Sequence, residues 1–544
     1  MRSRGRCPMI WPRRRTSCDA HPFPFFFPSA FPSEGWGPVT GGPMLGPSLR
    51  WGREVMKRLS NLTLGALPAS VTQPSYDRAA VKPGIVHLGI GAFHRAHQAV
   101  IFERALEAGD LRWGITGASL RSAGVRDEMN PQDGLYTVVT RDGSGDGLKV
   151  MGVVREVLVA PENAEALVER LADPDVHIVT LTVTEKGYKL DPATGALRAD
   201  DPDVVADCTD LSAPKTAPGF LVAALSARRD LGLPPFTAIS CDNLPHNGRR
   251  LEQAVLAIAR AHSDGLADWI AREGAFPETM VDRIVPATTP ADIAALESVT
   301  GLSDQAMVKA EPFLQWVIED RFCGPRPAFE ALGVQITASV APWEEAKLRM
   351  LNGAHSGIAY LGGLAGIDFV HEVVAIPAFE RFVQALWDEA EATLSPPPGL
   401  DVAAYRTALM ERFTNPALQH RTRQIAMDGS QKLPQRLLAT IAARVAKGLD
   451  VDALALAVAA WMRWQGGRDD SGVAHIVDDP LAAVTASRLA GVSDPEAQVD
   501  ALLSIDAIFP PALAADDWLR GALVRHLTSL AAQGARGTVE AFAR

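Results

Sequence analysis

A lysine, an asparagine and a histidine occur at short intervals in the second half of the chain, as Lys347-x4-Asn352-x2-His355. An amine can take up a hydroxyl proton, and a carboxamide can donate hydrogen bonds to an oxyanion without titrating. In an α-helix over residues 346–355, Asn352 would lie roughly 140° and His355 roughly 80° around the axis from the lysine. The three would share one broad face. A single helix lysine is usually a solvated charge, so the spacing alone leaves both interpretations open.

A glycine pair stands where a dinucleotide fold places its phosphate-binding turn. The apolar run 84–88 predicts a strand, Gly89-Ile90-Gly91 follows it, and residues 94–108 predict a helix. The third glycine of the usual pattern is replaced by His94, so we expect the helix to pack less closely on the sheet. By itself the motif fits an ordinary strand-turn-helix as well as a cofactor site.

The first half of the chain alternates strand and helix patterns, which predicts a doubly wound, mostly parallel sheet. Further strands are expected at 113–119, 177–183, 236–240 and 280–285, with helices at 164–171 and 249–262. No carboxylate follows the second strand between Ser119 and Gly124, where one would bind the adenosine ribose. A preference for NAD over NADP therefore does not follow from these residues.

The remaining chain divides into two further parts. After about residue 335, Ala/Leu/Arg-rich helical stretches dominate, which predicts a Rossmann-type domain over 56–335 and a helical domain over 336–544. Residues 1–55 are rich in Pro, Arg and Phe and are expected to be a disordered leader. Met56 and the residues after it read like a normal protein start. The alternative is therefore that the leader is an artefact of the choice of start codon.

Composition excludes several classes of partner and site. A net charge of −11 disfavours nucleic acid and anionic membrane surfaces, and no apolar run is long enough to span a bilayer. Five cysteines (Cys7, Cys18, Cys208, Cys241 and Cys323) form no CxxC pair, which favours a reducing cytoplasm and no metal. His94 and His97 lack companion ligands, so we expect them on a helix surface rather than on a metal.

Five motifs in order resemble the polyol-specific long-chain dehydrogenases, a family that includes mannitol 2-dehydrogenase and fructuronate reductase, also called mannonate oxidoreductase. The motifs occupy residues 89–98, 182–188, 240–243, 280–286 and 347–355. The resemblance runs from about residue 75 to the C-terminus. It implies an NAD-dependent, metal-independent oxidoreductase that is a monomer or a weak dimer.

The resemblance also implies roles for single residues. Lys347 resembles the catalytic base, Asn243 and Asn352 the pair that holds the reacting oxygen, and His355 their substrate-positioning partner. Asp282 and Lys432 resemble polar residues of the substrate pocket. The GxGxxH turn belongs to the family pattern, so the cofactor contacts are expected at Gly89, Gly91, Phe93 and His94.

These residue types suit hydride transfer from a secondary alcohol. A base must accept the hydroxyl proton while the hydride leaves for the nicotinamide. The pKa of a lysine must fall from ~10.4 to roughly 7–8 for this purpose, which burial and the positive nicotinamide can supply together. Amide NH₂ groups can stabilise the developing alkoxide by roughly 2.7–4 kcal/mol per donor.

The substrate is expected to be a linear sugar derivative. Gln424 and residues 428–436 resemble fructuronate reductase more than mannitol dehydrogenase, and Lys432 or a nearby arginine could bind a uronate carboxylate. Interconversion of D-fructuronate and D-mannonate is therefore the first expectation. Mannitol and fructose, or another polyol pair, is the alternative, and an NAD-binding regulator without turnover is a third.

Metal independence gives a direct test. Because neither the cysteines nor His94 and His97 form a plausible ligand set, prolonged treatment with a chelator should leave turnover intact. Activity should be measured before and after dialysis against the chelator. Inactivation that zinc restores would contradict the prediction.

Overall fold

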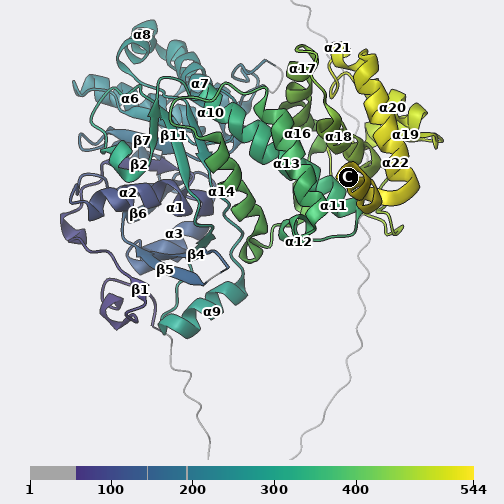
Figure 1. The fold of residues 1–544 in the computed structure, drawn as a ribbon. Coiled ribbons are helices and arrows are strands. Elements are labelled where there is room, and N and C mark those ends of the chain that lie inside the picture. The colour runs from purple at the N-terminus through teal and green to yellow at the C-terminus, as the bar shows by residue number, and fades with distance from the viewer. Residues whose placement is uncertain (1–56, 144, 192–193) are drawn as a thin grey trace, which may run out of the picture. The chain divides into compact units, whose positions relative to one another are not determined.

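The computed structural model describes residues 57–143, 145–191 and 194–544. The predicted leader, residues 1–55, lies outside the described residues. The described residues pack as one compact unit. The predicted order, an α/β half followed by a helical half, is confirmed (Figure 1).

A five-stranded parallel sheet forms the centre of the α/β half. Its strands, in spatial order, are β6 (Val154–Val159), β3 (Ile115–Ser119), β2 (Ile85–Leu88), β7 (Ile178–Leu181) and β8 (Thr237–Ser240). The register pairs Ile85 with Ile115 on one side and with Ile178 on the other. The chain winds outward in one direction from β2 through β3 and in the other through β7, so the strand order reverses between β2 and β7. Such a reversal opens a crevice at the carboxyl ends of the strands.

Both faces of this sheet are covered, which explains its nearly continuous apolar strands. Ile85 packs into the cluster that contains helix α2, whereas Val86 and Leu88 pack into the cluster that contains α4, α6 and α7. The helices of this half are α1 (Ala92–Ala96), α2 (Gln98–Glu107), α3 (Gly124–Met129), α4 (Ala164–Ala172), α5 (Pro202–Thr209), α6 (Ala217–Asp230), α7 (Asn247–His262), α8 (Asp264–Glu273) and α9 (Pro290–Thr300).

Two smaller sheets complete the α/β half, and one corrects the sequence analysis. The strand expected at 280–285 is β9 (Thr279–Asp282), which pairs antiparallel with β11 (Gln315–Glu319) and not with the central sheet. Apolar runs do not specify their partner, because pairing depends on residues that are distant in sequence. The other strands are β12 (Gln335–Thr337) beside β11, and β1 (Val71–Thr72), β5 (Asp146–Met151), β4 (Tyr136–Arg141) and β10 (Val308–Ala310) in a mixed four-stranded sheet.

The helix expected over 94–108 is broken. It begins at Ala92, and its backbone leaves helical geometry at His97 (φ −124°, ψ −88°), which separates α1 from α2. The break turns the His97 imidazole inward, where its Nε2 donates a 2.8 Å hydrogen bond to the carbonyl of Gln315. Both His94 and His97 are fully buried, so the expectation of surface histidines is wrong.

Beyond β12, the regular elements of the described residues are all helices, joined by loops and two isolated β-bridges. Helix α18 lies at the centre of their core, where its residues from Ala453 to Trp461 are all buried, and α11 and α22 pack against it. These helices are α10 (Ala341–Ala346), α11 (Gly353–Leu364), α12 (Val370–Val374), α13 (Pro377–Glu391), α14 (Val402–Thr414), α15 (Thr422–Ile425), α16 (Gly429–Leu433), α17 (Ala439–Val445), α18 (Asp452–Trp464), α19 (Ala482–Leu489), α20 (Pro495–Leu503), α21 (Pro511–Ala514) and α22 (Asp517–Phe542). Among the helices described, none combines the length and the apolar character needed to cross a bilayer.

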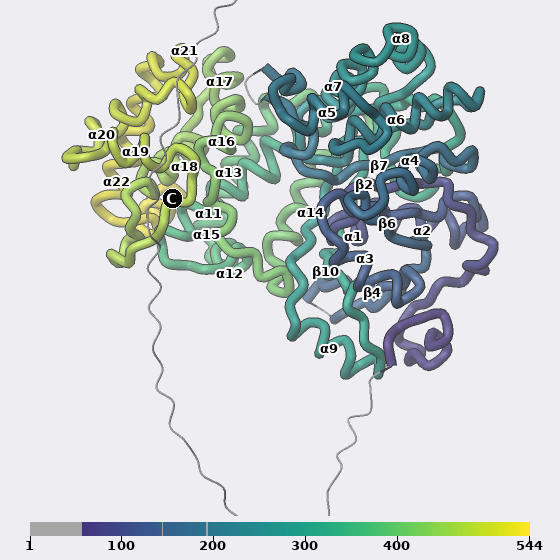
Figure 2. Tube along the Cα trace, turned by 180° about the vertical axis from the view of Figure 1, so that it is seen from behind, coloured from purple at the N-terminus to yellow at the C-terminus, as the bar shows by residue number. Residues whose placement is uncertain are grey.

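Helix α14 connects the two halves. In both views it lies against the α/β half, and its buried apolar residues also pack into the helical core (Figures 1 and 2). Just beyond its end, Asn415 Nδ2 donates a 3.0 Å hydrogen bond to the carbonyl of Arg141, at the end of β4. The fold therefore places side chains of α14 beside the strand ends of the α/β half.

The glycine turn after β2 gives the first structural prediction. Gly89 has φ +91°, and a Cβ there would lie 2.2 Å from the Thr182 carbonyl oxygen, a backbone atom that cannot move aside. Gly89→Ala should therefore lower the free energy of unfolding by at least about 2 kcal/mol. Gly91→Ala is the control, because at Gly91 the nearest atom to a Cβ is 3.8 Å away. Equal denaturation midpoints for the two variants would contradict this prediction.

Candidate active site

A cavity of about 580 Å³ opens at the carboxyl ends of the central strands and extends to the helical half. The strand ends contribute Gly91 after β2, Thr182 after β7 and Asn243 after β8. Most of the residues predicted from sequence line this cavity: Lys347, Asn243, Asn352, His355, Asp282, Lys432, Gly91 and Phe93. The structure thus brings residues from five separate sequence motifs to one place.

Gly89 and His94 do not line the cavity. Gly89 forms the tight turn beneath it, and the ring of His94 stacks on His87 with centroids 3.4 Å apart. His94 fills the space between the helix and the sheet, which explains why this turn needs no third glycine. Burial holds the pKa of His94 well below its usual value, so the ring is neutral.

The first turn of α1 forms a cradle for an anion. The amides at the start of a helix have no acceptor four residues back, and they point out of the helix end. Gly91 caps this end and faces the cavity with open space where a side chain would be. The turn therefore fits the pyrophosphate of a dinucleotide, because that group needs both the free amides and a close backbone approach.

The helix expected over 346–355 exists, but one turn of it is π-helical. Residues Lys347–Asn352 form this turn, η6, between α10 and α11, and the amide of Gly353 bonds to the Leu348 carbonyl five residues earlier. The i→i+5 hydrogen bond of a π-turn brings residues five apart closer around the axis than an α-helix, which would separate Lys347 and Asn352 by roughly 140°. The irregular turn therefore brings both side chains to one cavity wall.

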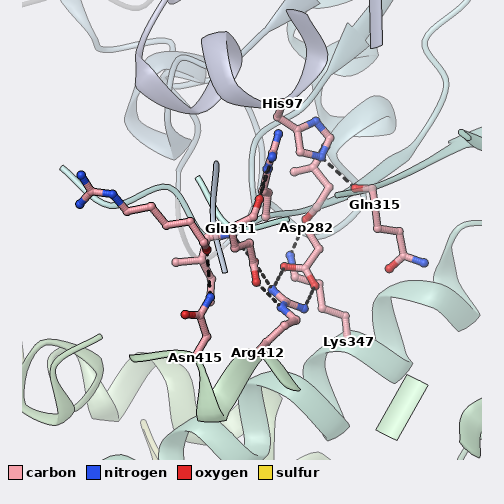
Figure 3. A network of polar contacts seen from close by, with 11 residues as sticks. His97, Asp282, Glu311, Gln315, Lys347, Arg412 and Asn415 are labelled. Atoms are coloured by element: carbon pink, nitrogen blue, oxygen red, sulfur yellow. Dashed lines mark hydrogen bonds and ion pairs between the residues drawn. The ribbon is translucent and has the colours of Figure 1, made fainter. Parts of the chain in front are cut away.

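Lys347 reaches across the cavity floor to the α/β half. Its Nζ donates a 2.7 Å hydrogen bond to the carbonyl of Val281, which directly precedes Asp282 at the end of strand β9 (Figure 3). Burial lowers the pKa of Lys347, the nearby Asp282 carboxylate partly offsets this effect, and Arg412 adds to it. The net pKa lies below the usual value, as a base that works near neutral pH requires.

A buried arginine, which the sequence analysis missed, lies next to the lysine. Arg412 on α14 donates to both oxygens of Asp282 at 2.7 and 2.9 Å and to both oxygens of Glu311 at 2.8 and 2.9 Å (Figure 3). Burial raises the pKa of Asp282, but Arg412 outweighs burial, and the net pKa falls. Nothing local distinguishes Arg412 from other helix arginines, because its partners lie 130 and 101 residues away.

His355 lines the cavity from helix α11. Its ring is 4.8 Å from that of Phe413 and 5.1 Å from that of His420. Burial lowers the pKa of His355 well below its usual value and that of His420 to about 4, so both rings are neutral. The Nε2 of His355 is buried and has no hydrogen-bond partner in the described residues. A buried polar atom of this kind is expected to meet a ligand.

Lys432 is more constrained than expected. Its Nζ donates to the carbonyls of Met427 and Ile425 at 2.5 and 3.3 Å. Arg436, four residues on, also lines the cavity.

The described residues contain no group of three or more side chains that could ligate a metal ion, and the three cysteines among them are free.

Comparisons with known proteins agree with this geometry. Residues 83–331 match the mannitol dehydrogenase Rossmann domain, and residues 339–531 match the mannitol dehydrogenase C-terminal domain. The chain belongs to the mannitol dehydrogenase family of oxidoreductases.

Three relatives illustrate the range of this family. The chain is 45% identical to the uncharacterized oxidoreductase YeiQ of Escherichia coli, over 84% of this chain and 93% of that protein. It is 43% identical to D-mannonate oxidoreductase of the same species, over 87% of this chain and 98% of that protein. A solved ternary complex of Pseudomonas fluorescens mannitol 2-dehydrogenase with NAD and D-mannitol is 39% identical, with a TM-score of 0.77 over 89% of this chain and 99% of that one.

The buried arginine gives a prediction about stability. Arg412→Met leaves the carboxylates of Asp282 and Glu311 buried without their partner, so the free energy of unfolding should fall by about 3–5 kcal/mol. Denaturant unfolding should be compared with that of Arg520→Met. Arg520 also pairs with two carboxylates, but its side chain is 33% exposed against 4% for Arg412. The control should unfold at nearly the wild-type midpoint, and equal midpoints for both variants would disprove the role of Arg412.

Proposed function

We propose that the protein is an NAD-dependent oxidoreductase that interconverts D-fructuronate and D-mannonate, with Lys347 as the general base. The observation that carries this proposal is the position of Lys347. Its amine lies on a cavity that also contains the phosphate-binding turn at Gly91, and burial lowers its pKa. A proton acceptor and a dinucleotide cradle on one cavity are what hydride transfer from an alcohol requires.

The cofactor site rests on the α/β half. Gly89 and Gly91 shape the turn, and the backbone at Phe93 and His94 provides amides of the first helical turn. When bound, NAD supplies the hydride acceptor for oxidation, or the donor as NADH for reduction. The NAD named in the mannitol 2-dehydrogenase complex supports this assignment.

Proton transfer is assigned to Lys347. As a neutral amine it can donate to the Val281 carbonyl and still offer its lone pair to a substrate hydroxyl. In the reverse direction, the ammonium returns the proton to the reduced carbonyl oxygen. The Asp282 carboxylate, fixed by Arg412, limits how far the pKa of Lys347 falls.

The oxygen that gains negative charge needs donors that do not titrate. Asn243, just after β8, and Asn352, in η6, face the same cavity, and their NH₂ groups can donate to a developing alkoxide. The neutral His355 ring, with its unpartnered Nε2, can orient a neighbouring hydroxyl. Asp282 and Lys432 complete the polar lining around the substrate.

A sugar acid is favoured over a neutral polyol. The 43% identity to D-mannonate oxidoreductase and the cationic groups near Lys432 support this choice. The second candidate, mannitol 2-dehydrogenase activity, is supported by the complex with D-mannitol. We also propose a monomer or weak dimer in the cytoplasm, on the basis of the family resemblance and the unpaired cysteines.

Replacement of the base tests the mechanism. Lys347→Ala should lower kcat roughly 10²–10⁴-fold, because it removes the proton acceptor, whereas NADH affinity measured by fluorescence should change little. In the wild type, alcohol oxidation should rise with pH as Lys347 loses its proton, with an inflection below the usual pKa of 10.5, and ketone reduction should fall. The variant should show neither of these two pH dependences.

Lys447→Ala is the matched control, since this lysine is exposed in the same helical half and its amine, within the described residues, donates to the Ala392 carbonyl. It should keep wild-type kcat and pH dependence. If Lys347→Ala retained more than about a tenth of wild-type kcat, Lys347 would not be the base.

A further inference from the structure

Arg436 is a cavity-lining guanidinium with almost no partners. It lies in the second π-helical turn, η8 (Pro434–Leu438), and its backbone packs against the start of α11: a Cβ on Gly353 would lie 3.0 Å from the Arg436 carbonyl oxygen. Its one hydrogen bond in the described residues runs from Nη1 to the Ser356 hydroxyl at 3.4 Å. No carboxylate of the described chain forms an ion pair with it.

The other cations on this cavity are already engaged. Arg412 is bound by two carboxylates, and Lys432 donates to two backbone carbonyls. Arg283 donates to the carbonyls of Glu311 and Ala96. Arg436 alone among these four offers a planar set of donors that protein groups barely use, and a guanidinium of this kind matches the two oxygens of a carboxylate.

The position of Arg436 also suits a residue that binds substrate rather than one that forms a structural ion pair. The charge of Arg436 lowers the pKa values of Lys347 and His355, which places it near both residues. Burial lowers the pKa of Arg436 itself to about 10, as expected where a charge lacks a counterion. The sequence indicated Lys432 or a nearby arginine for a uronate carboxylate, and its place on the cavity distinguishes Arg436 from Arg421 and Arg423, which do not line it.

We propose that Arg436 binds the carboxylate of a sugar-acid substrate and so sets the preference of this site for uronates and aldonates over neutral ketoses and polyols. The proposal rests on the proposed function, because it names the substrate class of the same cavity. Arg436 contacts the far end of the substrate in this assignment, whereas Lys347 acts at the reacting hydroxyl. Its loss should therefore affect substrates according to their charge.

The test compares an acid with a neutral ketose. Wild type, Arg436→Met and Arg423→Met are assayed with NADH and D-fructuronate or D-fructose. Arg436→Met should lower kcat/KM for D-fructuronate about 10- to 150-fold, the range expected for a hydrogen-bonded charge, and change that for D-fructose less than about threefold. Arg436→Lys, which keeps the charge but loses the fork, should fall between wild type and Arg436→Met. Arg423 is exposed and does not line the cavity, so Arg423→Met should match wild type.

A binding assay separates this proposal from the proposed function. In the presence of NADH, D-mannonate should raise the melting temperature of wild type more than D-mannitol does, and Arg436→Met should remove that difference. If the wild type turned over neither ketose but kept this Arg436-dependent difference, the proposed function would fail and the anion site would stand. Two results would overturn the assignment of Arg436 to the substrate carboxylate. One is an equal loss of kcat/KM for D-fructuronate and D-fructose in both Arg436 variants. The other is an equal rise in melting temperature with D-mannonate and D-mannitol in wild type.

Discussion

The active site depends on one buried arginine held between two carboxylates. Arg412 comes from helix α14, whereas Asp282 and Glu311 come from the ends of strands β9 and β10. Each of these charges would be costly to bury alone, so the three stabilise one another only in this arrangement. Because Asp282 follows Val281 directly, the same contact fixes the carbonyl that holds the Lys347 amine. The junction of the two halves and the position of the proposed base are thus one structural feature (Figure 3).

The electrostatics of the cavity follow from this arrangement. Burial lowers the pKa of Lys347, and the Asp282 carboxylate limits the fall, but Arg412 lies behind that carboxylate and reduces its effect. The same burial keeps His355 and His420 neutral, so neither competes with the lysine as a cation. The cavity therefore contains a buried amine with a lowered pKa beside two imidazoles that stay neutral and can only donate or accept hydrogen bonds. This division of roles suits an alcohol that must lose a proton and a hydride together.

The two halves contribute different chemistry for a physical reason. The parallel sheet places its turns and helix ends at one edge, where free amides favour phosphate. Lysine, histidine and arginine side chains come mainly from the helical half, where two π-turns, η6 and η8, pack against each other. The irregular turns are costly in isolation, but they direct Lys347, Asn352 and Arg436 into one cavity. In the proposed function, the substrate lies between these two sets of groups.

The sequence by itself determined the α/β half, the helical half and the turn at Gly89 and Gly91, because periodicity and glycine positions are local signals. The Lys347, Asn352 and His355 spacing and the family motifs also indicated which residues share the site. Only the tertiary structure decided the rest. The antiparallel pairing of β9, the hydrogen bond of buried His97 and the partners of Arg412 depend on residues more than 30 positions away. A charged side chain has the same sequence signature whether it is solvated, paired or free in a cavity, so the engagement of Lys432 and the availability of Arg436 appear only when the chain is folded.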